Sequence, residues 1–450
     1  MRNIKKIYFY GIGGVSMAGF AELLKSKGID VSGYDSKESS ITKKLVSLGI
    51  EVVYKVSDIN LDKVELVVYS SAIGENSLEM QKLKETDIKS ISRGEFIGEI
   101  LKDYEKPICI SGTHGKTTTT ALVSTIFLEA DKNPTISVGG HLPIINGVFK
   151  IGGHEYFILE ACEYKNNFLN FKGTTSLIMN VEMDHSDFFK DVKEIRKSFN
   201  DFAKLSKEKV IINKEIDGID EILDGVTNEI ITYSLKDIDA TYYIGDVENK
   251  DNLVLFKLFK RGEFLGDFES TLLGNHNLYN ILSALSVSLE NGVSVEKCKS
   301  GLMKFSGINR RFQYKGEKNG VVVYDDYAHH PTACVEILKS IKKLTNSKVY
   351  AVFQPHTFSR TISLFDDFSK AFYDASEIIL VDIFPARETD EGIINSEKLV
   401  EEINKNSYNS KYEESFESCL SYLEKKVERG DIILTIGAGD VYKIGESFLS

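Results

Sequence analysis

The chain has 450 residues, of which 42% are hydrophobic and 27% are charged. That length corresponds to about three domains, and the mix excludes wholesale disorder, collagen and coiled-coil rods. The 55 basic and 67 acidic residues give a net charge of −12. Because so acidic a chain repels a phosphate backbone and no local basic patch interrupts it, we expect no nucleic-acid partner.

Cysteine usage and hydropathy bear on the compartment. The five cysteines are scattered, and none forms a CxxC pair, which argues against a zinc ribbon. An odd, scattered set suits a reducing compartment. No stretch approaches the ~20 apolar residues of a membrane span, and the apolar run at residues 7–10 is too short for a signal peptide. We expect a cytoplasmic protein with no membrane partner.

The first region alternates short apolar strands with helical patterns. Strands are expected at residues 7–10, 31–34 and 66–69. Strand, helix and strand in this rhythm predict a doubly wound parallel α/β sheet.

A glycine turn follows the first of these strands. Gly11, Gly13 and Gly14 match the GxGxxG pattern only in part, because Ser16 stands at the third glycine position. Asp35 ends the second strand, where a ribose-binding acid would lie. A dinucleotide site, a mononucleotide site and a plain strand-to-helix turn all remain possible here.

The second region begins near Lys106 with a strand at 108–110, a glycine-rich turn and a helix. The turn reads Gly112, Thr113, His114, Gly115, Lys116, Thr117 and Thr118. Backbone N–H groups at such a turn can bind phosphates, Lys116 can reach the β and γ phosphates, and Thr117 offers a hydroxyl to Mg²⁺. The generic phosphate-loop pattern fails at Ile110, where it requires a glycine. The alternative is a helix-capping turn with an exposed lysine.

Two further predicted strands of this region end in polar residues. Glu160 ends the strand at 157–159, and Asp184 and His185 follow the strand at 177–179. Each alone is typical of a solvated strand end. Because parallel strands share one carboxyl edge, the phosphate loop, the acid and the histidine are expected to converge, which favours a metal site. A β-rich stretch at about 241–272 then precedes an amphipathic helix opened by Gly274, Asn275, His276 and Asn277, of which Asn275 is a candidate cap.

The third region starts near Gly307, with strands expected at 321–324, 349–353, 378–383 and 432–436. Polar clusters follow the first two of these strands, where α/β sheets bind ligands. They are Asp325, Asp326, Tyr327, Ala328, His329, His330 and Pro331, and then Gln354, His356 and Arg360. Adjacent histidines point different ways, so at most one of His329 and His330 is expected to serve chemistry.

Taken together, these segments resemble the Mur ligase family, and most closely its members that join L-alanine to UDP-N-acetylmuramate in peptidoglycan precursor synthesis. The resemblance spans the chain through GIGGVSM, SSAI, GTHGKTTT, EACEY, NVEMDH, GNHNLYN, RRFQ, DDYAHHP, QPHTFSRT, the ARE at 386–388 and the GAGD at 437–440. One departure is EACEYK at 160–165, where many members have EADESD; Glu160 keeps the leading acid.

The resemblance implies three α/β domains: a Rossmann-like domain for the UDP substrate at 1–105, a central P-loop ATPase-like domain at 106–306, and a Rossmann-like domain at 307–450 that brings the amino acid and closes over ATP. It implies ATP and Mg²⁺ as cofactors, small-molecule substrates only, and a monomer or weak homodimer.

The resemblance also implies site residues. Substrate-binding positions would be Gly11, Gly13, Gly14, Ser16, Asp35, Ser70, Ser71, His329, His330, His356 and Arg360. ATP would be bound by Gly112 to Thr118 together with His276, Asn277, Asn280, Arg311 and Asp326. Mg²⁺ would be held by Thr117, Glu160 and His185, and the catalytic residues would be Lys116, Arg311 and His185.

The expected chemistry is activation of a carboxylate by ATP as an acyl phosphate, which an amine then attacks. The transition state brings two anions together, which calls for Lys116, Arg311 and Mg²⁺. Because water would hydrolyse the acyl phosphate, we expect the third domain to close over the others.

Three alternatives remain open from the sequence. They are another ligase of the superfamily, such as one that attaches a murein tripeptide or glutamate to folate; a nicotinamide dehydrogenase that uses the first glycine turn; and a P-loop regulatory switch without ligase activity. The dehydrogenase would leave the turn at 112–118 without a role, and the regulatory switch predicts ATP hydrolysis that does not depend on an amino acid.

Overall fold

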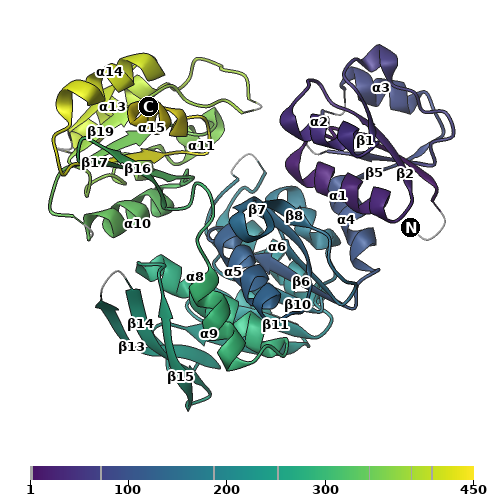
Figure 1. The fold of residues 1–450 in the computed structure, drawn as a ribbon, viewed down its shortest axis with the longest axis horizontal. Helices are drawn as coiled ribbons and strands as arrows, with labels where there is room; N and C mark the ends of the chain where they lie inside the picture. The colour runs from purple at the N-terminus through teal and green to yellow at the C-terminus, as the bar shows by residue number, and fades with distance from the viewer. Residues whose placement is uncertain are drawn as a thin grey trace.

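The computed structural model describes residues 4–70, 73–74, 76–185, 188–250, 253–343, 345–386, 388–406 and 409–450. In this part of the chain there are three β-sheets, of five, ten and six strands, with helices around them. Figure 1 shows three lobes: amino-terminal in purple, central in blue to green, and carboxyl-terminal in green to yellow. The predicted α/β class is confirmed.

The amino-terminal sheet is parallel, with strand order β3-β2-β1-β4-β5. Its strands are β1 (Lys6–Tyr10), β2 (Asp30–Tyr34), β3 (Glu51–Val53), β4 (Leu66–Tyr69) and β5 (Lys89–Ser92), and its helices are α1 (Val15–Ser26), α2 (Ser40–Ser47), α3 (Leu78–Lys84) and α4 (Arg93–Leu101). The central strand β1 is almost entirely apolar because both of its faces are covered. The three strands predicted here are confirmed.

The central sheet has strand order β15-β14-β13-β12-β11-β10-β6-β9-β7-β8. Its strands are β6 (Lys106–Ser111), β7 (Thr135–Leu142), β8 (Gly147–Lys150), β9 (Tyr156–Glu160), β10 (Thr175–Ile178), β11 (Lys209–Asn213), β12 (Glu229–Ser234), β13 (Tyr242–Lys250), β14 (Leu253–Lys260) and β15 (Glu263–Ser270). Strand β6 lies between β9 and β10 and is parallel to both. The segments after these three strands therefore leave the sheet at one edge.

The helices of the central lobe are α5 (Lys116–Glu129), α6 (Val192–Leu205), α7 (Ile219–Leu223), α8 (Asn275–Glu290) and α9 (Val295–Lys304). Helix α5 packs against α8 and α9 on one side and against the sheet on the other. Its residues from Thr117 to Phe127 are all buried. This enclosure fixes the start of α5, and with it the glycine turn before the helix.

The carboxyl-terminal sheet has strand order β16-β17-β21-β18-β19-β20, parallel except for the β16–β17 pair. Its strands are β16 (Gln313–Lys318), β17 (Val321–Asp326), β18 (Val349–Phe353), β19 (Glu377–Leu380), β20 (Ser410–Tyr412) and β21 (Ile432–Ile436). Its helices are α10 (Pro331–Lys342), α11 (Phe358–Ser363), α12 (Phe365–Phe368), α13 (Ser396–Lys405), α14 (Phe416–Lys426) and α15 (Tyr442–Leu449).

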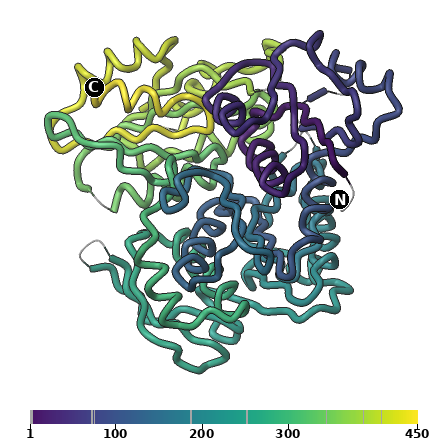
Figure 2. The backbone as a smooth tube through the Cα atoms, turned by 45° about the vertical axis from the view of Figure 1, so that its right-hand side comes forward, coloured from purple at the N-terminus to yellow at the C-terminus, as the bar shows by residue number. Residues whose placement is uncertain are grey.

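The amino-terminal and central lobes share an apolar core. The Phe20 ring lies 5.2 Å from Phe149 and 6.1 Å from Phe157, measured between centroids. A Cβ on Gly19 would come within 2.4 Å of the Phe149 ring, so glycine allows this close approach. The carboxyl-terminal lobe contacts the central lobe through polar pairs that include Arg311–Thr117, Thr332–Glu182 and Arg360–Asp184. Figure 2 shows the same three lobes from another side.

The predicted domain divisions at 105/106 and 306/307 fall in the connections between the sheets. Helix α4 ends at Leu101 before β6 begins, and α9 ends at Lys304 before β16 begins. These boundaries stay a prediction. None of the helices in the described residues combines the length and apolar character that a bilayer crossing requires.

Candidate active site

The glycine-rich turn at 112–118 joins the end of β6 to the start of α5. Gly112 and Gly115 have φ of 144° and 79°, a region that side chains disfavour. A Cβ on Gly115 would lie 2.3 Å from Oδ1 of Asn280 on α8. A side chain at position 115 would collide with α8, which packs directly against the turn, so glycine is required there. The same packing places the predicted Asn280 beside the turn.

The turn is bonded to the segment that follows β10. The backbone N–H of Thr113 donates to the carbonyl of Asn180 (3.1 Å), and that of His114 donates to Asn180 Oδ1 (2.7 Å). Glu182 N–H donates to the Thr113 hydroxyl (2.9 Å), and the His114 Nε2 lies 3.3 Å from Glu182 Oε2. The two segments thus form one unit.

Lys116 lies folded over its own turn. Its ammonium donates to Thr113 O (3.1 Å), to Gly112 O, and to both oxygens of Glu163 at 3.0 and 3.1 Å. Burial disfavours the charged ammonium, but the Glu163 carboxylate outweighs this effect, and the pKa of Lys116 is raised above its usual value. Lys116 is therefore a largely buried, positively charged side chain that is paired with Glu163.

Thr117 and Glu160 form an oxygen-rich pair beside this cation. The Thr117 hydroxyl bonds the Glu160 side chain, whose Oε1 accepts the N–H of Gly139 at 2.6 Å. Burial raises the pKa of Glu160 above its usual value. A carboxylate whose burial disfavours its charge, next to a hydroxyl, fits the hard oxygen donors that Mg²⁺ prefers. The residues present therefore fit the predicted ion.

His185, the third predicted metal ligand, lies near Glu163, the carboxylate that binds Lys116. Its Nε2 is 3.9 Å from Glu163 Oε1 and 3.8 Å from Asp184 Oδ2. Within the described residues its close charged neighbours are thus Glu163 and Asp184 rather than Glu160. Whether Thr117, Glu160 and His185 hold one ion together stays a prediction.

A different trio meets the geometric requirement for a single ion. Ligand atoms of His114, Glu182 and His330 lie within 4.8 Å of one another. However, Nδ1 of His330 accepts the N–H of Thr332 (3.3 Å), and its Nε2 lies 3.2 Å from Met183 O. Since both ring nitrogens of His330 are engaged, these residues act in docking the carboxyl-terminal lobe.

Arg311 reaches the central turn from the start of the carboxyl-terminal lobe. Its NH2 donates to the Thr117 hydroxyl at 3.3 Å, and its guanidinium lies 5.2 Å from the centroid of the Tyr327 ring. Asp326 accepts the N–H groups of Phe312 (2.6 Å) and Ala328 (2.7 Å), and burial raises the pKa of Asp326. Asp326 thereby fixes the backbone that follows Arg311.

The predicted residues of α8 lie in its first turns. Asn280 Nδ2 donates to Asn277 Oδ1 (3.2 Å), and Thr119 Oγ1 donates to Asn280 Oδ1 (3.4 Å). Burial lowers the pKa of His276, whose Nδ1 has no hydrogen-bond partner among the described residues. Thr118 is buried at the start of α5.

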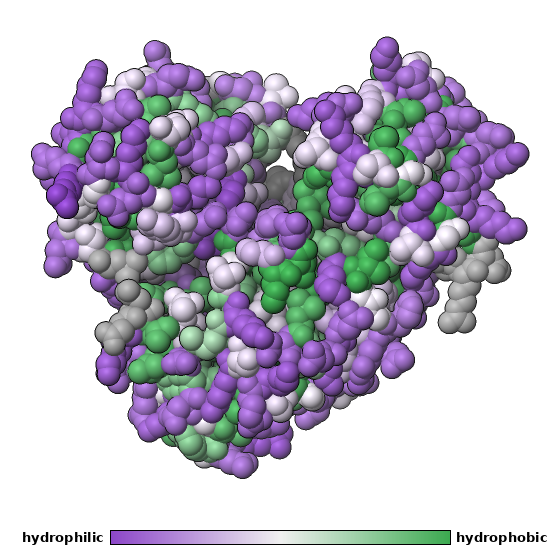
Figure 3. Space-filling view, viewed as in Figure 1, coloured by the Kyte–Doolittle hydropathy of each residue, from purple (hydrophilic) through white to green (hydrophobic). Residues whose placement is uncertain are grey.

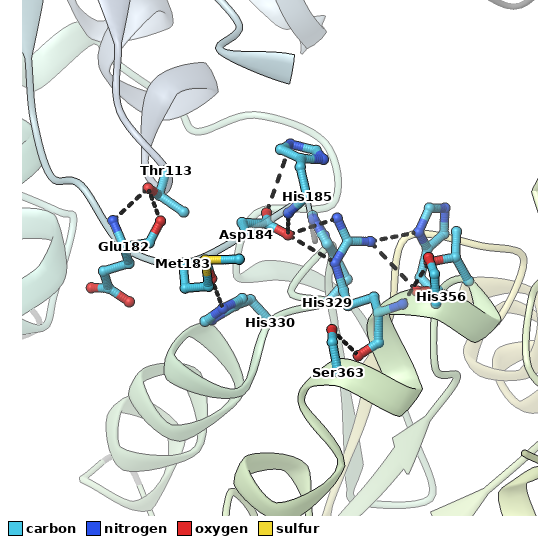
Figure 4. Close-up of polar contacts among 12 residues, drawn as sticks. Thr113, Glu182, Met183, Asp184, His185, His329, His330, His356 and Ser363 are labelled. Atoms are coloured by element: carbon cyan, nitrogen blue, oxygen red, sulfur yellow. Dashed lines mark hydrogen bonds and ion pairs between the residues drawn. The ribbon is translucent and has the colours of Figure 1, made fainter. Parts of the chain in front are cut away.

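Three residues predicted to bind the amino acid come together in the carboxyl-terminal lobe. Arg360 NH1 lies 3.0 Å from His356 Nδ1, and the rings of His356 and His329 are 5.7 Å apart between centroids. Burial and the nearby Arg360 lower the pKa of His329 well below its usual value. His330 is separate from this cluster, as Figure 4 shows, because its ring contacts Met183.

The glycine turn of the amino-terminal lobe lies close to other residues that were predicted to bind the substrate. The N–H of Gly13 donates to Asp35 Oδ2 (2.8 Å), and a Cβ on Gly11 would lie 3.1 Å from Ser70 Cβ. Gly14 precedes α1, which contains Ser16. Ser71 lies outside the described residues. Figure 3 shows an opening between this lobe and the carboxyl-terminal lobe, above the central one.

Family models match all three lobes. They are the Mur ligase family catalytic domain at residues 6–105, the Mur ligase middle domain at 110–288, and the Mur ligase glutamate ligase domain at 310–439. A UDP-N-acetylmuramate--L-alanine ligase of Clostridium novyi (strain NT) is 42% identical over 455 residues, which covers 99% of this chain and 98% of the relative. The chain belongs to the Mur ligase family. A Clostridium kluyveri relative with the same name is 43% identical over 451 residues, with 99% and 98% coverage.

Solved structures agree with the Mur ligase fold. The UDP-N-acetylmuramate-alanine ligase of Thermotoga maritima superposes with a TM-score of 0.81 at 23% identity, covering 99% of this chain and 98% of that one. A murein peptide ligase of Psychrobacter arcticus gives 0.73 at 22% identity, with the same coverage. The predicted three-domain α/β architecture is confirmed.

In this Mur ligase, two acidic residues make contacts that the sequence did not predict: Glu163, which was not a candidate, and Asp184, which was noted only beside His185. Glu163 binds Lys116, and Asp184 binds Arg360. Glu163 lies three residues after Glu160, just before the turn at Tyr164–Asn170, and that spacing was the available signal. For Asp184 the available signal was its position directly before the predicted His185.

Proposed function

We propose that the protein joins L-alanine to the carboxylate of UDP-N-acetylmuramate, using ATP and releasing ADP and phosphate. The observation that carries this proposal is the 42% identity, over 99% of the chain, to a relative named for that reaction. The site supports it, since Lys116, Arg311, Thr117 and Glu160 meet at one edge of the central sheet. Family membership does not agree with the dehydrogenase and regulatory-switch alternatives.

The reaction needs two steps. A carboxylate oxygen of the sugar acid attacks the γ-phosphorus of ATP, the bond from that phosphorus to the bridging oxygen breaks, and ADP leaves. The amine nitrogen then attacks the acyl carbon, and the bond from this carbon to the phosphate oxygen breaks. Phosphate leaves and the amine loses its proton. The first step brings anions together, so its rate depends on fixed cations near the γ-phosphate.

The chain supplies those cations from two lobes. We assign Lys116 to the β and γ phosphates, and Arg311 to the γ-phosphate from across the domain seam. The turn from Gly112 to Thr118 would hold the phosphates through its N–H groups at the start of α5. Thr117, Glu160 and His185 would hold Mg²⁺, which would supply further neutralisation of phosphate charge.

The remaining predicted residues bind the other parts of the substrates. Asn280 lies beside the turn at 112–118 and donates to Asn277; we assign both, with His276, to the nucleotide of ATP, and Asp326 to its ribose. The amino-terminal glycine turn with Asp35 and Ser70 would bind the UDP group. His329, His356 and Arg360 would receive the amino acid.

Phosphate release tests this function. With ATP, Mg²⁺ and UDP-N-acetylmuramate, we expect release that depends on L-alanine, together with formation of the amide product. Glycine, L-serine and a murein tripeptide form the comparison panel. Release that depends on the tripeptide alone, or on no amino compound, would contradict the proposal.

Lys116→Ala tests the phosphate assignment. We expect turnover to fall by about 1,000-fold or more, because an interaction with transferring charge is lost. The far-UV circular dichroism should not change. Lys304→Ala, which removes an exposed lysine bound to Glu129, is the matched control and should retain activity. Full activity in Lys116→Ala would overturn the assignment.

A further inference from the structure

Three consecutive residues after β10 contact the carboxyl-terminal lobe. Glu182 Oε2 accepts from the Thr332 hydroxyl (3.1 Å), Met183 O faces His330, and Asp184 Oδ1 accepts from Nε and NH2 of Arg360 at 3.2 and 3.1 Å. The last contact is an ion pair between side chains that are only 8% and 10% exposed. Figure 4 shows Asp184 beside His185 and opposite the carboxyl-terminal residues. A buried ion pair at this seam calls for an explanation, because it is costly to desolvate.

Protein contacts occupy most of the hydrogen-bonding groups of Arg360. A guanidinium has five N–H donors. Nε and NH2 face Asp184, while NH1 faces the ring Nδ1 and, at 3.4 Å, the carbonyl of His356. Arg360 therefore cannot present a complete two-donor fork to a substrate carboxylate without releasing a partner, and a single NH2 hydrogen stays available.

The two oxygens of the Asp184 carboxylate differ in the hydrogen bonds that they accept. Oδ1 accepts from Arg360 and also from the backbone N–H of His185 at 2.7 Å. No described residue donates a hydrogen bond to Oδ2, and the nearest charged group is His185 Nε2 at 3.8 Å. An ionised carboxylate oxygen with free lone pairs thus lies beside an arginine that has one free N–H.

An amino acid carries the complementary charges. Its α-ammonium is a donor with three N–H groups, and its α-carboxylate is an acceptor. We propose that Asp184 is the residue that selects for the α-ammonium group, with Oδ2 receiving the ammonium while Arg360 receives the α-carboxylate. The zwitterion then lies along the ion pair that joins the two lobes. This inference rests on the proposed function and adds a specificity-determining residue to it.

The arrangement explains the position of the pair at the seam. Because Asp184 belongs to the central lobe and Arg360 to the other, the amino acid contacts both only when the lobes are docked. Asp184 also directly precedes His185, so the ammonium end of the amino acid is placed toward the edge where the phosphate turn lies.

Asp184→Asn is the first test. The asparagine oxygen can still accept from Arg360 and His185, but an NH2 group replaces Oδ2 and opposes an ammonium. We expect the KM for L-alanine to rise by about 30-fold or more, with the KM values for ATP and UDP-N-acetylmuramate within about threefold of wild type. Asp184→Glu should recover part of the loss.

A partial reaction separates this role from a structural or metal role. Hydroxylamine attacks an acyl phosphate without needing an α-ammonium contact. With ATP and UDP-N-acetylmuramate but no amino acid, we expect Asp184→Asn to form the hydroxamate at a rate near that of wild type. Loss of hydroxamate formation, or equal rises in all three KM values, would overturn the proposal, as would an unchanged KM for L-alanine.

Substrate analogues and a control variant complete the test. Propionate lacks the ammonium, so wild type should bind L-alanine far more tightly than propionate, and Asp184→Asn should lose most of that difference. Thr332→Val removes a neighbouring seam contact without touching the ion pair, and its KM for L-alanine should stay within about twofold. If wild type showed no phosphate release dependent on L-alanine, the proposed function itself would fail, which is a separate outcome.

Discussion

At the scale of single residues, Gly115 is required both for its backbone conformation and for the close contact with Asn280. Gly115→Ala combines a positive φ of 79° with a Cβ that would lie 2.3 Å from Asn280 Oδ1 and 2.8 Å from Met179 Cε. We expect the turn to shift and kcat/KM for ATP to fall by about 100-fold or more, because phosphate binding depends on turn geometry. Steady-state kinetics with varied ATP measure this effect.

Gly28→Ala is the control for backbone strain alone. Gly28 has the same φ of 79°, but nothing lies within 4 Å of the position that a Cβ would occupy there. The substitution should cost about 1 kcal/mol of stability and leave the kinetics unchanged. Equal kinetic effects in the two variants would show that contact with Asn280 is irrelevant.

The turn at 112–118 between a strand and a helix could be predicted from the sequence. The carboxylates that bind Lys116 and Arg360 could not. The glycines and Lys116 stand between a strand and a helix, so local pattern is sufficient. Glu163 is 47 positions from Lys116, and Asp184 is 176 positions from Arg360. Such contacts depend on how strands order in the sheet and how lobes dock, which no local pattern contains.

At the scale of elements, the carboxyl end of α8 is joined to the sheet by Glu290. Its carboxylate binds Lys209 of β11 (2.9 Å), Lys260 of β14 (2.9 Å) and the Tyr242 hydroxyl of β13 (2.8 Å). Burial disfavours the ionised carboxylate, but these donors outweigh burial and lower the pKa of Glu290 to about 2. The contacts hold α8, and with it Asn280, in place.

Glu290→Gln should therefore destabilise the protein in a pH-dependent way. Because the folded pKa lies below the unfolded value of about 4.3, the stabilisation is fully present above about pH 4.5 and is lost as the pH falls toward 2. We expect a loss of about 2 kcal/mol at pH 7 and a much smaller one near pH 3, from melting temperatures at both pH values. The exposed Glu229→Gln is the control. A difference independent of pH would contradict this account.

Buried central strands can be predicted from the local sequence pattern, whereas short edge strands cannot. Runs such as 108–110 and 157–159 are apolar because both faces of a parallel sheet are covered, so they were found from sequence. The edge strands β8 and β20 could not be predicted in this way, because β8 is only half-buried and β20 has three residues. Half-buried, short strands lack a continuous apolar signal.

At the scale of the whole molecule, the interface between the amino-terminal and central lobes differs in chemical character from the interface between the central and carboxyl-terminal lobes. The amino-terminal and central lobes share the aromatic contacts of Phe20, Phe149 and Phe157, whereas the contacts described between the carboxyl-terminal and central lobes include hydrogen bonds and the Asp184–Arg360 ion pair. Hydrogen bonds at the surface contribute little net free energy, and the cost of desolvating the buried Asp184–Arg360 pair offsets much of its attraction. We therefore expect the carboxyl-terminal lobe to move as a body while the other two stay together.

Small-angle scattering tests this expectation. A non-hydrolysable ATP analogue together with UDP-N-acetylmuramate should reduce the radius of gyration, because in the proposed reaction Arg311 would bind a phosphate held by the central lobe. Phe20→Ala should instead lower the melting temperature, since it opens a cavity in a shared core. Scattering without compaction on ligand binding would count against domain closure.

The central claim is that the turn at 112–118 holds a triphosphate whose terminal group passes to the sugar acid before the amine attacks. Labelling both carboxylate oxygens of UDP-N-acetylmuramate with ¹⁸O and analysing the phosphate released in the presence of L-alanine tests it most directly. We predict one ¹⁸O atom in each phosphate and one in the amide. Amide formation that leaves the phosphate unlabelled would contradict the claim.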